Sequence, residues 1–310
     1  MKRRDFLKTS AAVGIAALSF DKLQAAIDTN SLMAEAASPD LVAVMGGEPV
    51  QLLERALQEM GGIEKFVKKG QSVVIKPNIG WDKKPEFAAN TNPELVSALV
   101  KQCLKAGASK VTVFDQTCDN WQKCYLNSGV EKAVKDAGGT MLPANDEVYY
   151  KDVKFPQGVK LKSAKIHQAL LDADIWFNVP VLKNHGGAKM SIAMKNYMGI
   201  VWDRQYFHAN DLQQCIADCC TYEKKPVLHI IDAYRCLRKS GPQGRSVSDT
   251  SLLKSIIVST DVVAADTAAI GLFNQVEQME INEVGHIANG EKLKLGTQDL
   301  SKLNVKRIRL

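Results

Sequence analysis

A regular alternation of strand-like and helix-like runs, which starts near residue 40, is the feature that most constrains the fold of this chain. Short runs rich in β-branched residues, such as QSVVIKPN and KVTVFDQ, are separated by longer runs with apolar residues at helical spacing, such as NPELVSALVKQCLKAG. Strands that alternate with helices of this length pair mostly in parallel and lie under helices on both faces. We therefore predict an α/β fold with a mostly parallel sheet and helices on both of its faces.

Other runs continue this alternation along the chain. The further expected strands are LVAVMGG (41–47), DIWFNVPVLK (174–183), KPVLHIIDAY (225–234) and KSIIVSTD (254–261). The further expected helices are residues 49–67, 129–139, 189–201, 211–223 and 262–273. The region 140–167 breaks the rhythm and alternates polar and apolar side chains. This pattern predicts a small β-rich insertion, which would form a lid or a small subdomain.

The first residues carry an export pattern. Arg3-Arg4 is followed by Asp5-Phe6-Leu7-Lys8 and then by a short, weakly apolar run, AAVGIAALSF. This order resembles a twin-arginine export signal, and the apolar run is too short to span a bilayer. We expect residues 1–36 to be the signal peptide, with Ala34-Glu35-Ala36 as the cleavage site and Leu23-Gln24-Ala25 as an earlier option.

The remainder of the chain, residues 40–310, is expected to form one α/β domain without an integral membrane segment. A twin-arginine signal makes the translocase of that pathway a partner during export, and it places the mature protein in the periplasm or another extracytoplasmic compartment. The net charge of +6 is mild, the 40 basic residues are dispersed among 34 acidic ones, and aromatic residues make up only 6%. Because these values do not describe a basic surface with interleaved aromatic residues, we expect no nucleic-acid partner.

The seven cysteines do not form a recognised metal-binding pattern. They are Cys103, Cys118, Cys124, Cys215, Cys219, Cys220 and Cys236. None belongs to a C-x-x-C pair or to the C-x-x-C-x-x-C run of a ferredoxin. An oxidising compartment permits a disulfide, and Cys118 and Cys124 are the nearest pair in a loop. The alternative is that most of the cysteines are small, buried apolar residues.

Polar side chains follow five of the predicted strands at the point where each strand ends. Parallel strands end at one edge of an α/β sheet, and ligands bind along that edge. We therefore expect these strand ends to bring seven polar residues to one crevice. They are Lys76, Asn78, Asp115, Lys183, His185, Asp232 and Asp261.

Four sequence blocks carry a family resemblance. KPNIG, VPVLKNH, MKNYMG and STDVVAADTAAIG are similar, in this order, to the blocks of the domain of unknown function 362 family, over about residues 45–275. That family has no settled activity. The resemblance implies that eight residues of this chain match motif positions of the family. They are Lys76, Asn78, Lys183, His185, Lys195, Asn196, Asp261 and Asp266.

The resemblance leaves the cofactor open. Many members of the family are identified as iron–sulfur proteins through ferredoxin-type cysteine clusters, and this chain lacks those clusters. The run HGGAK at residues 185–189 is also similar, more faintly, to the nickel-pincer lactate racemases. The cofactor is therefore unknown from the sequence, with a metal or an iron–sulfur centre as alternatives, and an organic cofactor is a further option for an enzyme.

The stretch VLKNHGGAKMSIAMKNYMGI gathers cationic side chains around a pair of glycines. A helix that starts near Gly187 would add free backbone N–H groups, so carboxylate or phosphate is the expected ligand. A solvated, lysine-rich turn is the alternative. Lys189 and Lys195 are six residues apart, which places them on roughly opposite faces of a helix. We expect Lys195 and Asn196 to face the crevice and Lys189 to face solvent.

Histidine and aspartate supply the candidate acid–base groups. His185 fits three roles, namely an acid or base, a metal ligand, or a partner in a loop hydrogen bond. Asp261 is also a candidate N-cap for the helix that follows it. Asp266 lies inside an otherwise apolar helix and needs a buried partner, for which we hypothesise Lys76 or Lys195.

A weaker metal signal comes from one predicted helix and the residues just before it. His208, Asp211, Cys215 and Cys219 are spaced so that they share one helical face. Such a set could hold a transition metal. The alternative is that Asp211 or Asn210 caps the helix and the two cysteines face the core.

These observations predict an anion-binding crevice at the carboxyl edge of the sheet. The candidate catalytic residues are His185, Lys183, Lys195 and Asp266. The candidate ligand-binding residues are Lys76, Asn78, Asp115, Asn196, Asp232 and Asp261. The first functional hypothesis is an exported enzyme, or cofactor-dependent protein, that acts on a small carboxylate or phosphate. The alternatives are a redox accessory protein with an iron–sulfur or other metal centre, as in an oxidoreductase, and a non-catalytic anion-binding protein.

Overall fold

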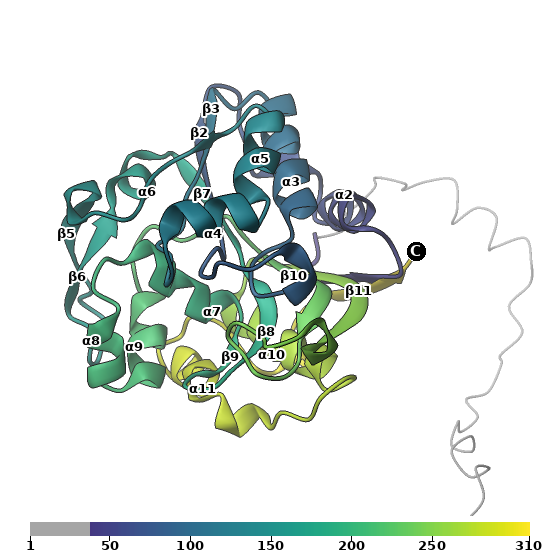
Figure 1. The fold of residues 1–310 in the computed structure, drawn as a ribbon. Helices are drawn as coiled ribbons and strands as arrows, with labels where there is room; N and C mark the ends of the chain where they lie inside the picture. Colours follow the sequence, from purple (N-terminus) through teal and green to yellow (C-terminus); the bar gives the residue numbers. More distant parts are fainter. Residues whose placement is uncertain (1–37) are drawn as a thin grey trace, which may run out of the picture. The chain divides into compact units, whose positions relative to one another are not determined.

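The computed structural model describes residues 38–310 as an α/β fold, which confirms the predicted fold class (Figure 1). A ten-stranded sheet, mixed but mostly parallel, forms its centre, and a second sheet consists of two antiparallel strands. The expected signal peptide and its cleavage sites lie outside the described residues. From residue 38 onward, no helix combines the length and the apolar character that crossing a membrane requires.

The strands of the large sheet follow the predicted runs closely. They are β1 (Leu41–Met45), β2 (Ser72–Pro77), β3 (Lys110–Val113), β4 (Thr140–Met141), β7 (Ile175–Val179), β8 (Val181–His185), β9 (Lys189–Ser191), β10 (Leu228–Leu237), β11 (Thr250–Ser259) and β12 (Val305–Arg309). Their order is β12-β1-β11-β10-β7-β2-β3-β4, with β8 paired to β10 and β9 paired to β8. β11 runs antiparallel to both of its neighbours, β1 and β10. The strands from β10 to β4 all run in one direction.

Ten α-helices accompany the strands in the described part of the chain. They are α2 (Pro49–Glu59), α3 (Pro93–Lys105), α4 (Trp121–Asn127), α5 (Val130–Asp136), α6 (Gln168–Asp172), α7 (Ala193–Asn196), α8 (Gln205–Ala209), α9 (Leu212–Cys219), α10 (Val262–Phe273) and α11 (Gly285–Lys292). Short 3-10 turns connect several of them, including η4 (Tyr197–Ile200) directly after α7. Helices α2 and α3 each begin with a proline, at a position where the missing backbone N–H leaves no hydrogen bond unmade.

The helices cover both faces of the sheet, as predicted, and each face has its own hydrophobic core. One core is formed with α2, α3, α4 and α5, and the other with α6 to α11 (Figure 1). Alternate residues of each strand enter opposite cores, because side chains alternate across a strand. In β2, Val73 and Ile75 enter the first core and Val74 the second. Lys76 follows this alternation on the side of Val74, which directs it toward α7 at the end of the strand.

The predicted strand 174–183 is divided at Pro180. β7 ends at Val179, and β8 starts at Val181. β7 pairs with both β2 and β10, whereas β8 pairs with β10 and β9. Proline has no N–H to donate to a neighbouring strand, so the pairing changes where the chain passes it. The sheet therefore forks after Pro180, with β2 on one branch and β8 on the other.

The prediction of a continuous helix over residues 189–201 was wrong. β8 and β9 form an antiparallel hairpin in which His185 pairs with Lys189. The glycine pair Gly186-Gly187 forms part of the turn between them, so it does not start a helix. Helix α7 starts only at Ala193 and has four residues. The alternation of exposed Lys189 and buried Met190 is typical of a strand. It is only a few residues long and leads directly into an apolar run, so the sequence did not separate it from the helix that follows.

The predicted β-rich insertion is confirmed as the two-stranded sheet of β5 (Tyr150–Lys154) and β6 (Ser163–His167). It packs on the rest of the fold through aromatic contacts, because the ring centroid of Tyr150 lies 5.3 Å from that of Trp202 and the ring centroid of His167 lies 4.0 Å from that of Phe114. The insertion also lines a hollow of about 650 Å³ that it shares with Gln116 and Arg204.

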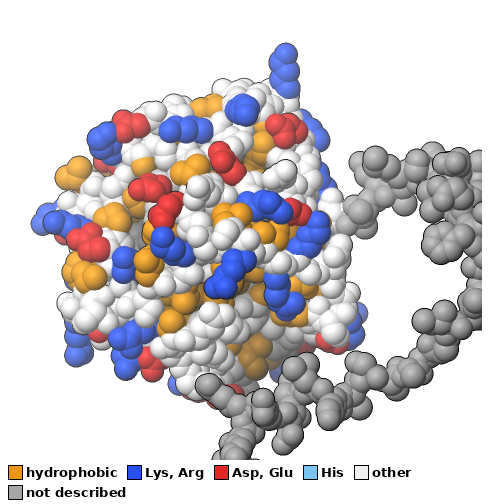
Figure 2. All heavy atoms as spheres, turned by 90° about the vertical axis from the view of Figure 1, so that its right-hand side faces the viewer, with side chains coloured by type: hydrophobic (Ala, Val, Ile, Leu, Met, Phe, Trp, Pro, Cys, Tyr) orange, Lys and Arg blue, Asp and Glu red, His pale blue; other side chains and the backbone are white. Residues whose placement is uncertain are grey.

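The surface charges are mixed on the face that Figure 2 presents. Lysine and arginine side chains alternate there with acidic and hydrophobic ones, without a continuous stripe of one sign. This face contains the region of α2, β11 and the carboxyl terminus.

Candidate functional site

A cavity of about 380 Å³ lies where β2, β3 and β8 approach α7 and α8. Eight of the predicted site residues line it. They are Lys76, Asn78, Asp115, Lys183, His185, Lys195, Asn196 and His208. The structure therefore places most of the predicted crevice at the carboxyl ends of parallel strands. The size suits a small ligand.

A buried ion pair forms the floor of the cavity. Lys76 Nζ lies 2.8 Å from Asp115 Oδ1, and both side chains are almost wholly inaccessible to solvent. Lys76 Nζ also donates to Asn196 Oδ1 at 2.7 Å, and Asp115 Oδ2 accepts from the backbone N–H of Ile79 at 2.6 Å. Burial lowers the pKa of Lys76, and the Asp115 carboxylate opposes that shift. The pair thus joins the end of β2 to the end of β3 and to α7.

A network of three asparagines extends from this ion pair. Asn196 Nδ2 donates to the carbonyl of Lys76 at 3.1 Å and to Asn178 Oδ1 at 2.8 Å. Asn78 Nδ2 donates to Asn196 Oδ1 at 3.3 Å. Asn178 was not among the predicted site residues. A buried amide in the otherwise apolar run IWFNV was the available signal, since a polar group inside a strand needs a hydrogen-bond partner.

Lys183 is fully buried beside the asparagines. Its Nζ donates to Asn78 Oδ1 at 2.9 Å and to the carbonyl of Ala89. Burial lowers the pKa of Lys183 to about 7, and the nearby Lys195 lowers it further in the same direction. Lys183 therefore changes its charge near neutral pH.

Lys195 differs from the other two lysines of the cavity. Among residues 38–310, the polar contact of its Nζ is Met198 Sδ, at 3.7 Å, and thioether sulfur is a weak acceptor. Burial lowers the pKa of Lys195 to about 8. The structure thus supports the predicted orientation of Lys195 toward the cavity. Lys189 lies outside it, where it forms an exposed ion pair of 2.7 Å with Glu283.

His185 is held in one protonation state by its own hairpin. Its Nδ1 accepts hydrogen bonds from the backbone N–H groups of Gly187 and Ala188, both at 3.1 Å. Burial lowers the pKa of His185 to about 2, so the ring is neutral. A neutral ring with Nδ1 as acceptor carries its proton on Nε2. His185 therefore has the loop hydrogen bonds that were one of its three predicted roles, and Nε2–H remains as a donor.

Arg204 is a cavity residue that the sequence analysis missed. Its guanidinium donates to the carbonyls of Gln116 at 3.0 Å and Thr117 at 2.6 Å, and it lies 3.3 Å from Cys118 Sγ. The residue comes from a loop between η4 and α8 and follows no strand, so the strand-end pattern could not identify it. Four basic side chains, Lys76, Lys183, Lys195 and Arg204, thus line the cavity with one carboxylate, Asp115.

Asp261 does not belong to this cavity. β11 is antiparallel to β10, and its last residue, Ser259, pairs with His229 near the start of β10. The end of β11 therefore lies at the opposite edge of the sheet, and the expectation that Asp261 joins the crevice was wrong. Its side chain caps α10, as the alternative interpretation proposed, by accepting from the N–H groups of Ala264 at 2.8 Å and Thr297 at 3.0 Å.

Asp232 also lies outside the cavity. It lies inside β10, which continues to Leu237, and so does not mark a strand end. Its carboxylate accepts from the backbone N–H groups of Asn92 at 2.7 Å and Tyr234 at 3.0 Å. Burial raises the pKa of Asp232 to about 6. Asp232 therefore holds the start of α3 against the sheet. The prediction that it binds the ligand in the crevice was wrong.

Asp266 is buried as predicted, but its partners are not lysines. The carboxylate accepts from the backbone N–H groups of Ala193 at 2.7 Å and Met194 at 3.0 Å. The hypothesised pairing with Lys76 or Lys195 was wrong, because both oxygens bond to the backbone of α7 and Asp266 does not line the cavity that holds the lysines. Burial raises the pKa of Asp266 to about 7. Asp266 therefore positions α7, which carries Lys195 into the cavity.

The predicted metal candidates do not converge. Asp211 caps α9 through the N–H of Gln214, and the thiols of Cys215 and Cys219 donate to backbone carbonyls. His208 is exposed and lines the cavity instead. Across the described part of the chain, no three His, Cys, Asp or Glu side chains are grouped so that they could hold a metal ion. These residues do not fit an iron–sulfur centre.

The disulfide that an oxidising compartment would permit is not formed in the described structure. Cys118 and Cys124 are both free, and so are the other five cysteines. Cys118 is exposed at the cavity, whereas Cys124 is a buried residue of α4. The alternative interpretation, in which most cysteines are buried apolar residues, describes six of the seven.

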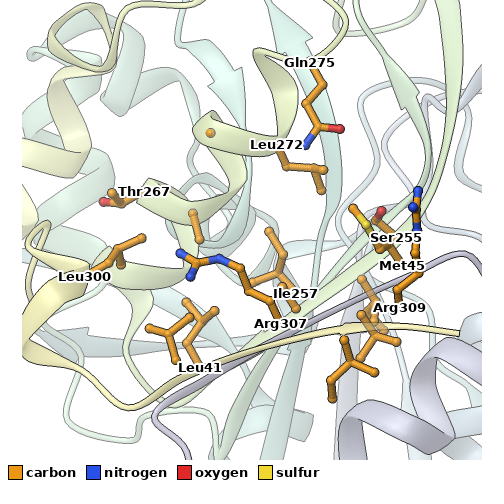
Figure 3. A pocket seen from close by; sticks show the side chains of 17 residues that line it. Leu41, Met45, Ser255, Ile257, Thr267, Leu272, Gln275, Leu300, Arg307 and Arg309 are labelled. Carbon is orange, nitrogen blue, oxygen red and sulfur yellow. The ribbon is translucent and has the colours of Figure 1, made fainter. Parts of the chain in front are cut away.

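A second cavity, of about 430 Å³, lies between α10 and the strands β1, β11 and β12 (Figure 3). Its lining is mainly aliphatic. Arg307 lies across its centre beside Ile257, and Arg309 lies toward the end marked by Met45. This cavity contains no lysine, histidine or carboxylate, so it lacks the acid–base groups of the first one.

Gly199 is predicted to be indispensable for the ion pair. A Cβ atom at this position would overlap Asp115 Oδ1 and Lys76 Nζ. We expect Gly199→Ala to lower the free energy of unfolding by about 3 kcal/mol, since it forces apart a buried charged pair. Gly271→Ala is the matched control, because no atom lies within 4 Å of a Cβ there and alanine favours the helix. Urea denaturation of both variants measures this, and equal effects would contradict the prediction.

Asp266→Asn is predicted to destabilise the protein by about 2 kcal/mol, since each carboxylate oxygen accepts one backbone N–H and the amide nitrogen that replaces one of them is a donor. Asp136→Asn is the control, because that carboxyl is 58% exposed in a surface ion pair. We expect the control to change stability by less than about 0.5 kcal/mol. Thermal and urea unfolding measure the difference, and an unchanged midpoint for Asp266→Asn would show that the contact to α7 is dispensable.

Comparison with known proteins supports the resemblance seen in the sequence. A model of the twin-arginine translocation pathway signal matches residues 1–19. The chain is 24% identical over 251 residues, 76% of each protein, to the thylakoid-associated protein sll1697 of Synechocystis sp.. It also has a TM-score of 0.47 and 11% identity to the lactate racemase apoprotein of Thermoanaerobacterium thermosaccharolyticum. That match covers 74% of this chain and 55% of the racemase, so the chain spans about half the length of that protein.

The model of the family described as Domain of unknown function (DUF362) matches residues 73–271, and the chain belongs to this family.

Proposed function

We propose that this exported member of the DUF362 family is an enzyme that acts on a small anionic ligand, a carboxylate or a phosphate, in the cavity of Lys76, Lys183 and Lys195. The observation that carries the proposal is the charge of the cavity lining. Asp115 neutralises Lys76, but Lys183, Lys195 and Arg204 have no carboxylate partner among the residues that the structure describes. Placing several cations together in a partly buried site costs free energy unless an anion joins them.

The chain's own groups divide into those that would bind an anion and those that would move a proton. Arg204 is fixed by two backbone carbonyls, and Lys183 is fixed by Asn78 and Ala89. Such fixed cations suit the binding of a carboxylate or phosphate. Lys183 and Lys195 have pKa values of about 7 and about 8, so either amine can give or take a proton near neutral pH.

His185 complements these amines as a neutral donor. Its Nε2–H is the free position of the ring, because Nδ1 is occupied by two backbone N–H groups. A fixed neutral donor can stabilise charge that develops on a ligand oxygen without adding a further cation. This arrangement favours His185 as an electrophilic hydrogen-bond donor over a base that acts through Nε2.

A non-catalytic anion-binding protein is the second candidate function. The same charge imbalance supports it, because binding alone requires the cations and not a movable proton. The two amines with pKa values near neutrality favour the enzyme, since groups with such values suit acid–base chemistry. Turnover of a bound acid, followed by the product in solution, separates the two candidates.

The twin-arginine signal supports an extracytoplasmic location for the mature chain. The pathway's translocase is then the partner during export, and the periplasm is the compartment in which the cavity would meet its ligand.

Anion binding is predicted to weaken as the pH rises from 7 to 9. Sulfate and oxalate remain dianions over this range, so only the protein titrates. Below about pH 7 both lysines are protonated, and above about pH 8 a neutral lysine must take up a proton to pair with the ligand. For each lysine that must take up a proton on binding, the affinity then falls by about tenfold for each unit by which the pH rises. Isothermal titration calorimetry with oxalate and sulfate measures this.

Two variants control that experiment. Lys183→Met should weaken oxalate binding by more than about tenfold, whereas Lys189→Met should not, because Lys189 is exposed and paired with Glu283. Arg204→Met tests the same site from a half-buried loop position, in case the fully buried Lys183 variant fails to fold. Absence of any oxalate or sulfate binding, or binding that both cavity variants retain, would overturn the proposed function.

A further inference from the structure

The three lysines of the cavity are not equivalent. Lys76 Nζ contacts two oxygens, those of Asp115 and Asn196. Lys183 Nζ also contacts two oxygens, those of Asn78 and Ala89. Within residues 38–310, Lys195 Nζ has Met198 Sδ as its polar contact and reaches no oxygen. Lys76 and Lys183 thus each donate two of their three N–H groups to protein oxygens, whereas the amine of Lys195 donates to no oxygen of the described residues.

The backbone of Lys195 is held firmly although its amine is free. Asp266 accepts from Ala193 and Met194, the two residues that precede Lys195. Asn196, the next residue, is tied to Lys76 and Asn178. The structure thus fixes the chain on both sides of Lys195 and leaves the end of its side chain in the cavity. This is the arrangement expected of a positioned reactive group, because a purely structural lysine would have an acceptor.

The surroundings of the amine favour its neutral form. Burial disfavours the charge of Lys195 most strongly, and Cys118 is the largest opposing influence on its pKa. Arg204 and Lys76 lie close enough to act in the same direction as burial. Asp115 opposes them, but its two oxygens are already committed to Lys76 and Ile79. A lysine that is desolvated and placed near other cations is the form in which the amine is nucleophilic at neutral pH.

We propose that Lys195 is a nucleophilic amine that forms a Schiff base with the carbonyl group of an oxo acid, whose carboxylate is bound by Lys183 and Arg204. The inference rests on the proposed function, because it assumes that an anion occupies the cavity, and it specifies the substrate class as a small acid with a ketone or aldehyde group. Lys183 and Arg204 are suited to the carboxylate because their donors are fixed in place by protein oxygens. His185 Nε2–H is suited to the carbonyl oxygen as a neutral donor.

The step is a condensation that needs no oxidant or reductant. The lone pair of the neutral Lys195 Nζ forms a bond to the carbonyl carbon, and the carbonyl π electrons move to its oxygen. The carbon–oxygen bond then breaks, and the oxygen leaves as water with one proton from the amine and one from solvent. The product is a protonated imine that retains one N–H and a single positive charge. That charge lies next to the carbon atoms whose bonds a later step would break or form.

Borohydride trapping tests the inference. The purified protein is incubated with pyruvate or 2-oxoglutarate, reduced with sodium borohydride, digested and mapped by mass spectrometry. We expect a stable adduct on the peptide that carries Lys195, with a yield at least about tenfold above that on any other lysine. Lactate, which has no carbonyl group, should leave no adduct, and excess oxalate should suppress the adduct by occupying the same cavity.

Two variants sharpen the test. Lys195→Arg keeps a cation but removes the nucleophile, so the adduct should be lost. Lys189→Arg, an exposed lysine of the same segment, should retain it. Adducts spread evenly over surface lysines, or absent with both oxo acids, would overturn the inference even if Lys195→Arg did not fold, because they are measured on the unchanged protein. Oxalate binding without trapping rejects the Schiff base alone, whereas failure to bind oxalate or sulfate rejects the proposed function as well.

Discussion

The buried ion pair of Lys76 and Asp115 is the contact on which the cavity depends. Removing two charges from water is costly, and such a pair is tolerated only when further hydrogen bonds satisfy the remaining donors and acceptors. Here Asn196 accepts from Lys76, and the backbone of Ile79 donates to Asp115. Removing either charge would leave the other buried without a partner. The pair therefore requires three separate segments, the ends of β2 and β3 and helix α7, to be in place together.

The same pair explains the unusual state of the remaining lysines. The cavity has one carboxylate, and that carboxylate is used by Lys76. Lys183 and Lys195 therefore stand among cations without an acidic partner, and burial lowers the pKa of each toward neutrality. An additional aspartate in the lining would favour the charged form of both amines and raise their pKa values toward the ordinary range. The scarcity of acid in the cavity is thus as informative as the presence of lysine.

The fold and most of the cavity could be predicted from the sequence by locating the ends of the strands. The limits of the same rule explain some of the residues that were predicted wrongly. A polar residue after an apolar run marks a strand end, and this rule located Lys76, Asp115 and Lys183. It failed for Asp261, because an apolar run does not reveal the direction of its strand, and β11 is antiparallel. The separate hypothesis that Asp266 pairs with a lysine failed because the partners of that carboxylate are backbone N–H groups, which every sequence has. Arg204 and the tautomer of His185 depend on how distant loops and one hairpin fold, which no local pattern records.

The fork of the sheet at Pro180 has a consequence for ligand binding. Before the proline, β7 pairs with β2; after it, β8 pairs with β10 and not with β2. The two walls of the cavity therefore belong to separate branches of the sheet. Lys183 connects the branches through its contacts with Asn78 and Ala89. An anion shared by groups on both walls would act as a further cross-link between them. A bound anion would then hold the two branches of the sheet together. The branches should therefore separate less readily in the anion-bound protein than in the empty protein.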